Sequence, residues 1–278
     1  MCGIAGIIGS KESASEARCA VLATSLNHRG PDDSGIEITP MRDGRMLGLV
    51  HRRLSILDLS HGGHQPMHNP ENNDWIVFNG EIYNFQSIRN VLKKNGYVFT
   101  SESDTEVILR AYQEYGVACL EKFRGMFAFA LWDDAHQTLF LATDRFGIKP
   151  LYVYISGETF AFSSEIKALL RAGVAPSTID PHAIESFLAY GAVQAPLTMI
   201  QDVQAMLPGT YLIYTPATHQ VVQHTYWQPG RRTAMATPMR DVLLDSVRHH
   251  LVSDVPVALF LSGGIDSSAL AILAHDVA

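Results

Sequence analysis

Short apolar runs separated by turn residues dominate the first 227 residues of the chain. Runs of this kind, with Gly-, Asp- or Asn-bearing turns between them, are typical of β-strands joined as hairpins. The predicted strands are Met1–Gly9, Arg45–His51, Trp75–Asn79, Met126–Trp132, Thr138–Thr143, Leu151–Ile155, Thr159–Ser163, Tyr211–Tyr214 and Val221–Trp227. Hairpins should therefore make up most of the middle of the chain.

Apolar residues at helical spacing predict helices between these strands. The predicted helices cover Ser13–Asn27, Phe85–Lys94 and Asp104–Tyr115. The third follows Ser103, and Glu106 three positions later completes the S-x-x-E pattern of a helix capping box. Runs of strands interleaved with helix pairs predict a layered α+β domain.

A polar, turn-rich stretch at Gln228–Arg232 marks a change of pattern that we interpret as a domain boundary. The elements predicted beyond it are a helix, a buried strand and a helix, at Pro238–Val252, Val257–Leu261 and Ser267–His275. We therefore expect a first domain at residues 2–228 and a second at residues 233–278. One strand and one helix cannot build a doubly wound core, so the second is expected to be the start of a larger domain, in a fragment or a truncated chain.

Composition and charge narrow the class of protein. The 278 residues are 47% hydrophobic and 18% charged, with a formal net charge of −7, which is typical of a globular protein. The chain has no basic run, which argues against a nucleic acid partner. It also has no apolar stretch approaching the roughly 18 residues of a membrane span and no signal peptide at its start. A cytoplasmic protein is expected.

The three cysteines, Cys2, Cys19 and Cys119, are too few for a disulfide framework and lack zinc-site spacing, so they are predicted to be reduced thiols. Removal of Met1 would leave a free α-amino group on Cys2. Such a group has a reference pKa of about 7.7, so it can act near neutral pH as the base for its own thiol. The alternative is that Cys2 is merely a small apolar residue of the first strand.

Asn79 and Gly80 lie where a predicted strand ends. Attack of a thiol on an amide produces an oxyanion, and an Asn side-chain N–H next to a Gly backbone N–H offers two donors that can converge on it. Taken alone, Asn-Gly is also the commonest hairpin turn signal.

A loop rich in glycine and serine, Leu261–Ser268, precedes the last predicted helix. Backbone N–H groups and hydroxyls at a helix N-terminus attract phosphate. The loop is not a Walker loop, which requires a lysine before its Ser or Thr. A glycine-rich turn without function is the alternative.

Together these motifs resemble those of the glutamine-hydrolysing asparagine synthetases, which begin with a class II (N-terminal nucleophile) glutaminase domain. The resemblance rests on Met1-Cys2-Gly3-Ile4, His28-Arg29-Gly30-Pro31-Asp32, Arg53-Leu54-Ser55-Ile56, Asn79 to Asn84, Ser103-Asp104-Thr105-Glu106, Asp144-Arg145-Phe146-Gly147 and Leu261 to Ser268. It implies an α+β N-terminal-nucleophile hydrolase fold, with antiparallel sheets between helical layers. The beginning of an α/β ATP-pyrophosphatase domain would follow.

The resemblance also implies a glutamine site, with Cys2 as nucleophile and Asn79 and Gly80 as oxyanion hole. The implied glutamine-binding residues are Arg53, Leu54, Ser55, Ile56, Leu57, Asn79, Gly80, Glu81 and Asp104. The carboxylate of glutamine suits a guanidinium, and its ammonium suits Asp104 and Glu81. Alternatively, Asp104 is only the first-turn carboxylate that a helix N-terminus favours.

Two arginines compete for the carboxylate of glutamine. Adjacent residues of a strand point to opposite faces, so only one of Arg52 and Arg53 can easily enter the pocket. The family pattern, Arg before Leu, selects Arg53.

For the second domain, the resemblance implies an ATP site whose Mg²⁺ ligand is Asp266. The implied ATP-binding residues are Leu261, Ser262, Gly263, Gly264, Asp266, Ser267 and Ser268. In the full-length enzyme, ammonia released from glutamine through a Cys2 thioester would amidate aspartate to asparagine at the expense of ATP. The glutaminase half itself needs no cofactor, and a homodimer is implied.

Two other functions are open at this point. One is an amidotransferase of the same superfamily that acts on a sugar, peptide or antibiotic precursor. The other is a non-catalytic binding or regulatory module, which the intact set of Cys2, Arg53, Asn79, Gly80 and Asp104 argues against.

Overall fold

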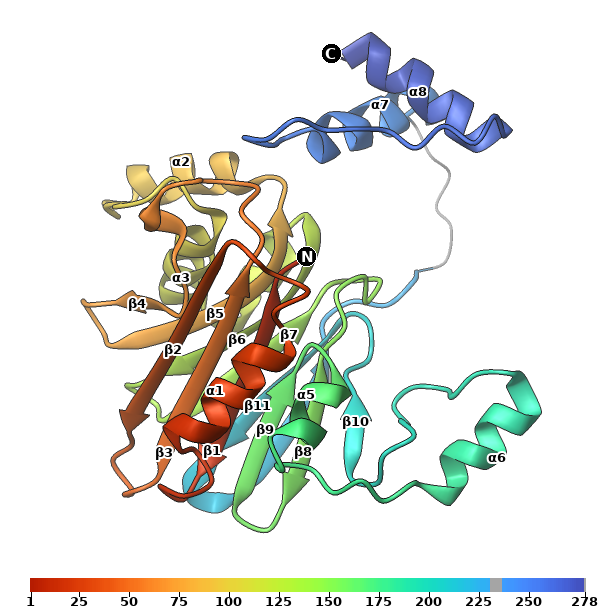
Figure 1. Ribbon diagram of the computed structural model, residues 1–278. Helices are drawn as coiled ribbons and strands as arrows, with labels where there is room; N and C mark the ends of the chain where they lie inside the picture. Colours follow the sequence, from red (N-terminus) through yellow and green to blue (C-terminus); the bar gives the residue numbers. More distant parts are fainter. Residues whose placement is uncertain (231–236, 278) are drawn as a thin grey trace.

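The computed structural model describes residues 1–230 and 237–277. Its strands form two six-stranded sheets in which neighbouring strands run antiparallel (Figure 1). The first sheet, in the order β10-β8-β9-β1-β3-β2, contains β1 (Gly3–Gly9), β2 (Asp33–Pro40), β3 (Met46–Arg53), β8 (Tyr152–Ser156), β9 (Thr159–Ser163) and β10 (Val203–Ala205). The second, in the order β12-β11-β7-β6-β5-β4, contains β4 (Met67–Asn69), β5 (Asp74–Ile82), β6 (Gly125–Asp133), β7 (Thr138–Thr143), β11 (Thr210–Thr215) and β12 (Gln220–Thr225).

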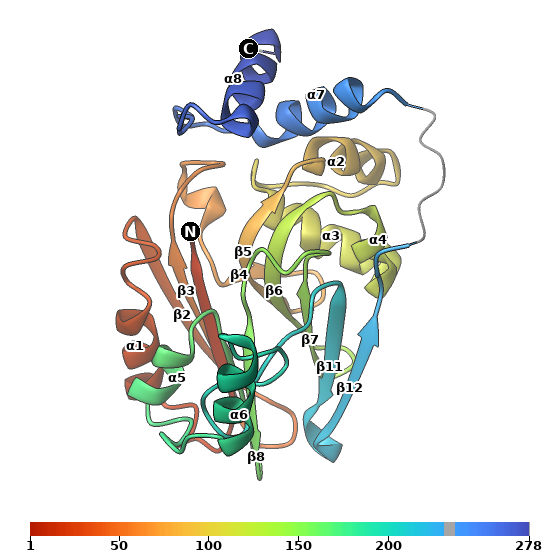
Figure 2. The same ribbon diagram turned by 90° about the vertical axis from the view of Figure 1, so that its right-hand side faces the viewer.

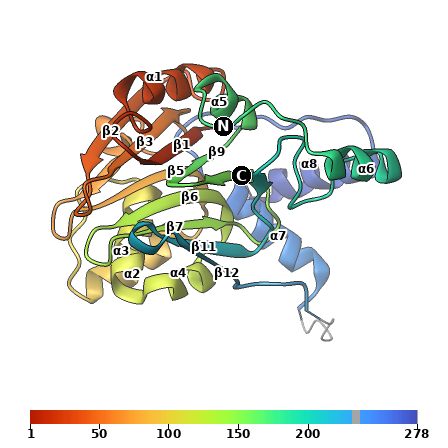
Figure 3. The ribbon, with the colours of Figure 1, turned by 90° about the horizontal axis from the view of Figure 1, so that it is seen from below.

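The two sheets pack face to face between helices, which gives four layers (Figure 3). The described helices are α1 (Glu16–Ser25), α2 (Phe85–Lys94), α3 (Asp104–Tyr115), α4 (Cys119–Lys122), α5 (Ile166–Arg171), α6 (Pro181–Tyr190), α7 (Met239–His250) and α8 (Ile265–Val277). Helices α1 and α5 cover the outer face of the first sheet, and α2, α3 and α4 cover the outer face of the second. The predicted α+β class and layered arrangement are confirmed.

Strand β1 shows why its sequence folds in the middle of the first sheet. Its side chains alternate, so that Ile4 and Ile8 enter the core between the sheets while Ala5 and Ile7 pack under the helices. At Gly6 a Cβ would lie 2.5 Å from the ring of Phe162, so only glycine fits there. The strand is buried along its whole length.

Each strand predicted before residue 228 is present, with ends shifted by a few residues. The first helix is shorter than the predicted Ser13–Asn27: it begins at Glu16 and ends at Ser25. Strands β2, β4 and β10 and helices α4, α5 and α6 were not predicted.

The prediction of a buried strand at Val257–Leu261 is wrong. These residues belong to no strand, and the Phe260 side chain is 99% exposed. A strand needs a neighbour to pair with its backbone N–H and C=O groups, and within residues 237–277 no other strand is present. The apolar run has nothing to pair with.

Helices α7 and α8 pack on one another and lie beyond the end of the sheets at which α2 sits (Figures 1 and 2). Of the predicted boundary, Arg231 and Arg232 lie outside the described residues, as does the predicted start of the second domain at 233. None of the helices described is long and apolar enough to span a bilayer.

Candidate active site

The inward-facing side chains of neighbouring strands meet at one end of the two sheets. In the register of β1 and β3, Gly3 lies opposite Arg52, which places Cys2 beside Arg53 at the end of the first sheet. Leu49 of β3 enters the core between the sheets, and alternation directs Arg53 to the same face.

Strand β5 supplies the facing wall. Its Val77 enters the core between the sheets, so alternation directs Asn79 toward the same gap from the second sheet. Behind the gap, the fully buried His51 donates from Nε2 to Phe78 O at 3.1 Å and so ties the two sheets together. Burial lowers the pKa of His51 to about 3, so this imidazole stays neutral.

A cavity of about 200 Å³ opens at this end, smaller than the pockets that hold drug-sized ligands and suited to a molecule of amino-acid size. The residues implied by the resemblance that line it are Cys2, Arg53, Leu54, Ile56, Leu57, Asn79, Gly80, Glu81 and Asp104. The further lining residues, which were not assigned to the glutamine site from the sequence, are Met1, Gly63, Gln65, Phe78, Ser103, Thr105, Met126 and Lys149. Ser55 does not line the cavity, and its N–H donates to Asp32 Oδ2 at 2.8 Å.

The thiol of Cys2 is held by the backbone of Leu54. The Leu54 N–H donates to Cys2 Sγ at 3.4 Å, and Sγ lies 3.6 Å from Leu54 O. Burial raises the pKa of the thiol, although the hydrogen bond from Leu54 and the charge of the terminal amine oppose this rise. The thiol therefore requires a base to become a nucleophile near neutral pH.

A guanidinium fixes the backbone of the same residue. Arg29 Nε donates to Cys2 O at 2.9 Å, and Arg29 Nη1 pairs with Glu165 at 3.0 Å. Arg29 belongs to the His28–Asp32 segment of the resemblance, which is the signal that could have placed it here. Burial also lowers the pKa of the Met1 amino group, which favours its neutral form.

Asn79 is a buried polar side chain of the cavity with an unused hydrogen-bond donor among the described residues. It is 1% exposed, and its Nδ2 has no hydrogen-bond partner in the described part of the chain. Buried amide donors are nearly always paired, so an unpaired one next to a cavity marks a place for a ligand acceptor. At Gly80 a Cβ would lie 2.2 Å from Met126 O, so the close approach of β6 requires glycine.

Arg53 is held by the loop that follows it. Its Nη1 donates to Ser60 O at 3.0 Å, and its Nη2 donates to Leu57 O at 3.1 Å and to Asp58 O. A Cβ at Gly63 would lie 1.9 Å from Arg53 Nη2, so the guanidinium lies flat against a glycine. Its position is therefore fixed by the surrounding backbone.

Asp104 is the first residue of α3 and also lines the cavity. It therefore has both of the positions predicted for it, in the first turn of a helix and in the glutamine site. Its Oδ2 accepts from Ile82 N at 2.9 Å, and burial raises the pKa of its carboxyl to about 7. Ser103 caps the helix by accepting from Thr105 N at 3.1 Å. The second half of the predicted capping box is wrong, because Glu106 accepts from Thr100 and Ser101 instead of from Ser103.

Glu81 and Lys149 are opposite charges on the cavity wall. Burial raises the pKa of Glu81 and lowers the pKa of Lys149, while the charge of each opposes the shift of the other. The backbone N–H of Lys149 is one of the donors to the Asp144 carboxylate, which organises the turn. The other donors are the N–H groups of Phe127, Phe146 and Ile148. Lys149 lies two residues after the Asp144–Gly147 motif. This motif is the sequence signal that could have identified Lys149 as a residue of the cavity.

The Leu261–Ser268 loop leads into α8 as predicted but does not line the cavity. The hydroxyls of Ser262 and Ser267 lie 3.0 Å apart, and the Ser262 hydroxyl accepts from Gly264 N at 3.4 Å. Asp266 is exposed in the first turn of α8. Among the described residues no group of three or more His, Cys, Asp or Glu side chains could hold a metal ion.

Comparison with known proteins adds to this geometry. Residues 1–227 match the family model described as glutamine amidotransferase domain, and residues 238–278 match the one described as asparagine synthase. "Asparagine synthetase [glutamine-hydrolyzing] 1" of Bacillus subtilis is 37% identical over 99% of this chain and 44% of its own length. "Putative asparagine synthetase [glutamine-hydrolyzing] 2" of Methanocaldococcus jannaschii is 34% identical over 97% of this chain and 56% of its own length. The chain thus spans about half the length of the curated relatives it matches.

The fold is also found among solved structures. A glutamine phosphoribosylpyrophosphate amidotransferase from B. subtilis superposes with a TM-score of 0.60 at 16% identity, over 99% of this chain and 64% of its own. The layered sheets therefore have the fold of that amidotransferase. The match over residues 1–227 shows that this chain belongs to the glutamine amidotransferase domain family.

Proposed function

We propose that this chain hydrolyses glutamine to glutamate and ammonia. The observation that carries the proposal is the buried Asn79 amide, whose Nδ2 has no partner among the described residues and which lies in the same cavity as the Cys2 thiol. Cys2 Sγ attacks the side-chain amide carbon of glutamine, and its proton passes to the α-amino group that removal of Met1 exposes. Asn79 Nδ2 and the Gly80 N–H donate to the oxyanion.

The remaining steps use the same groups. The tetrahedral intermediate collapses, the C–N bond breaks, and the proton held by the amine goes to the leaving ammonia. Water then attacks the thioester through a second oxyanion, which releases glutamate and restores the thiol.

Charged groups of the cavity orient the substrate. Arg53 binds the α-carboxylate of glutamine, and Asp104 and Glu81 bind its α-ammonium. The lining residues Leu54, Ile56 and Leu57 pack beside the substrate. Ser55 supports the loop through Asp32 and does not contact the ligand in this arrangement.

In the full-length enzyme, the ammonia amidates aspartate to asparagine in an ATP-dependent reaction. The asparagine synthase match at residues 238–278 and the names of the relatives support this. We place a glutaminase domain at 2–228 and the start of a synthetase domain at 233–278. The synthetase reaction and the reactive thiol suit a reducing, ATP-containing cytoplasm, and we propose a homodimer.

The glycine- and serine-rich loop fits the phosphates of ATP, because hydroxyls and backbone N–H groups gather at the N-terminus of α8. The residues that would hold ATP are Leu261, Ser262, Gly263, Gly264, Asp266, Ser267 and Ser268. Asp266 would also be a ligand of Mg²⁺. When bound, ATP supplies the activation of the acceptor carboxylate.

The direct test is glutamate release from glutamine by the purified chain without ATP. Release is expected, because each group that the glutaminase mechanism uses lines one cavity. Measurement of the intact mass shows whether Met1 has been removed. Its loss is expected, because a retained Met1 would block the α-amino group of Cys2 that is proposed to act as the base. Absence of release by a folded chain that has lost Met1 would contradict the proposal.

The KM for glutamine is expected to depend on pH through Asp104. Its pKa is raised to about 7, so the carboxylate that pairs with ammonium is present above pH 7 and lost as the pH falls. KM should rise by about tenfold per pH unit below 7. Asp104→Asn keeps the acceptor for Ile82 N, and its KM should be high at every pH. A wild-type KM that is flat between pH 5.5 and 8 would exclude this role.

A further inference from the structure

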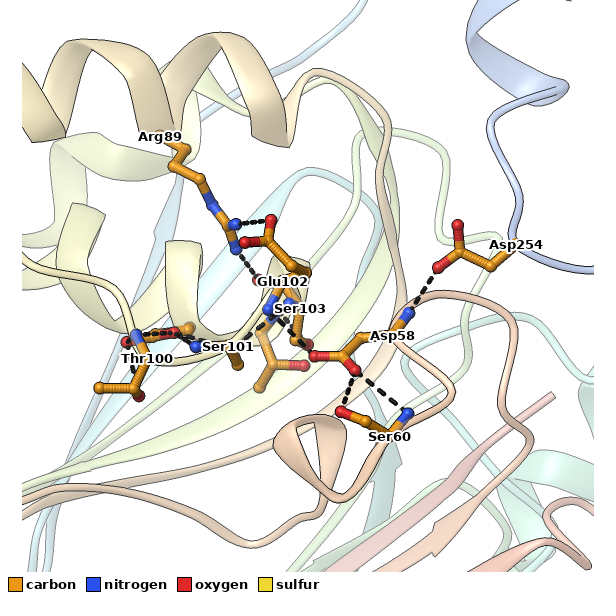
Figure 4. Close-up of polar contacts among 10 residues, drawn as sticks. Asp58, Ser60, Arg89, Thr100, Ser101, Glu102, Ser103 and Asp254 are labelled. Carbon is orange, nitrogen blue, oxygen red and sulfur yellow. Dashed lines mark hydrogen bonds and ion pairs between the residues drawn. The ribbon is translucent and has the colours of Figure 1, made fainter.

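The segment that follows α7 is bonded to the loop that follows Arg53. We call residues 54–60 the Arg53 loop. The Asp58 N–H donates to Asp254 Oδ2 at 2.8 Å (Figure 4). In return, the Asp254 N–H donates to Ile56 O at 3.0 Å. These reciprocal hydrogen bonds join the two parts of the chain at the wall of the cavity.

The Arg53 loop sets the position of the guanidinium. The carbonyls of Leu57, Asp58 and Ser60 accept the hydrogen bonds of Arg53, and Ile56 and Leu57 line the cavity. Any displacement of residues 56–58 therefore moves the group that is proposed to bind the carboxylate of glutamine.

The carboxylate of Asp58 connects the same loop to the segment that precedes α3. Its Oδ1 accepts from Ser60 N at 3.1 Å, and its Oδ2 accepts from Glu102 N at 3.0 Å (Figure 4). Burial acts to raise the pKa of Asp58, but the hydrogen bonds from Ser60 and Glu102 and the charge of Arg53 hold it below its usual value. Asp58 is thus an ionised acceptor at neutral pH.

Arg89 continues this connection toward Asp104. It pairs with Glu102, and its Nη2 donates to Ser103 O at 3.0 Å. Ser103 lines the cavity and directly precedes Asp104. Asp254 is therefore fastened to a loop whose hydrogen bonds hold Arg53 and extend to Ser103, the residue before Asp104.

Helix α7 adds contacts on the side of β5. The rings of Tyr83 and His250 lie 4.5 Å apart, and Arg124 pairs with Asp245 at 2.6 Å. Both members of this ion pair are about half exposed, so the pair holds the helix only weakly. The hydrogen bonds of Asp254 are the ones that act on the Arg53 loop itself.

We propose that Asp254 is a positioning residue for glutamine binding, which acts by holding the Arg53 loop. This inference rests on the proposed glutaminase function. It means that the segment after α7 controls the affinity of the cavity for glutamine, while the thiol and the Asn79 amide remain in place.

Two variants of the complete chain test this role in steady-state glutamate release without ATP. Asp254→Ala removes the acceptor for Asp58 N–H, and its KM for glutamine is expected to rise about 3- to 10-fold with kcat within about twofold of wild type. Asp254→Asn keeps an oxygen at that position, so its KM is expected to stay close to wild type. A residue with a merely structural role would instead lower both kcat and the melting temperature.

Asp276→Ala is the matched control, because Asp276 pairs with Arg240 at 2.6 Å between α8 and α7 and has no part in the Arg53 loop. Its KM should equal that of wild type. An unchanged KM in Asp254→Ala, or an equal rise in Asp276→Ala, would overturn the inference.

Hydrogen exchange over residues 54–60 gives a second measure that requires no turnover. Exchange is expected to be faster in Asp254→Ala than in wild type and unchanged in Asp276→Ala. Equal exchange in all the proteins overturns the positioning role. If the wild type releases no glutamate, the proposed function fails, and exchange still decides whether Asp254 holds the loop.

Discussion

Replacement of Cys2 by alanine is expected to lower the rate of glutamate release by roughly 10⁴-fold or more, because removal of a nucleophile abolishes the covalent route. The cavity would keep its binding groups, since Arg53 and Asp104 are held by other residues. Glutamine should therefore still bind to the Cys2→Ala variant. Steady-state glutamate release measures the first effect, and calorimetric titration with glutamine measures the second.

Cys19→Ala is the matched control for this variant. Cys19 is a fully buried residue of α1 that packs in the core between this helix and the first sheet, where burial raises the pKa of its thiol to about 11. It is neither exposed nor ionised at neutral pH, so its loss should leave the rate of glutamate release close to that of wild type. Equal rates in wild type and Cys2→Ala would show that the thiol is not the nucleophile.

Asn79→Ala is expected to lower kcat by about 10²- to 10³-fold with little change in KM, as for the loss of one oxyanion-hole donor. The buried Nδ2 has no partner within the described residues, so it is free to donate a hydrogen bond to the oxyanion. Its removal should not weaken the fold, because Nδ2 makes no hydrogen bond with the described residues. Steady-state kinetics and a melting curve measured together distinguish these effects.

Asn84 provides the comparison for Asn79. It lies five residues later, and its side chain donates to Lys122 O at 2.9 Å and accepts from Arg124 N at 2.8 Å. Asn84→Ala should therefore lower the melting temperature and leave kcat near that of wild type. A loss of kcat in Asn84→Ala as large as that in Asn79→Ala would refute a specific role for Asn79.

The apolar runs of the sequence predict the central strands well, because strands buried on both faces carry few polar residues. Strand β2 escapes prediction because it is an edge strand that pairs only with β3 and is mostly half-buried. Helix α6 did carry readable signals. Asp180 caps it, Pro181 begins it, and Gly191 ends it with a φ of 72°. At Val257–Leu261 the sequence predicts a strand that the structure does not contain, because an apolar run forms a strand only when a neighbouring strand can pair with it.

The candidate site is only partly readable from the chain. Strand alternation admits only one of Arg52 and Arg53 to the pocket, and the family pattern selects Arg53. In the structure Arg53 lines the cavity, whereas Arg52 donates to Gly30 O and does not line it. The meeting of Cys2 with Asn79, however, depends on two sheets packing together, which no local pattern encodes. Lys149 likewise reaches the cavity through a turn built around Asp144. Resemblance to a family supplied the grouping that local patterns lack.

The proposed nucleophile, Cys2, and the proposed amide donor, Asn79, lie on different sheets, so the separation between them is set by the thickness of the packed core. Large side chains such as Phe162 and Tyr214 fill that layer. The hydrogen bond of the neutral His51 spans it without titrating near physiological pH. We therefore expect the rate of the proposed chemical step to depend on the volume of the core between the sheets. Distant apolar substitutions can tune this rate while every residue in contact with substrate stays the same.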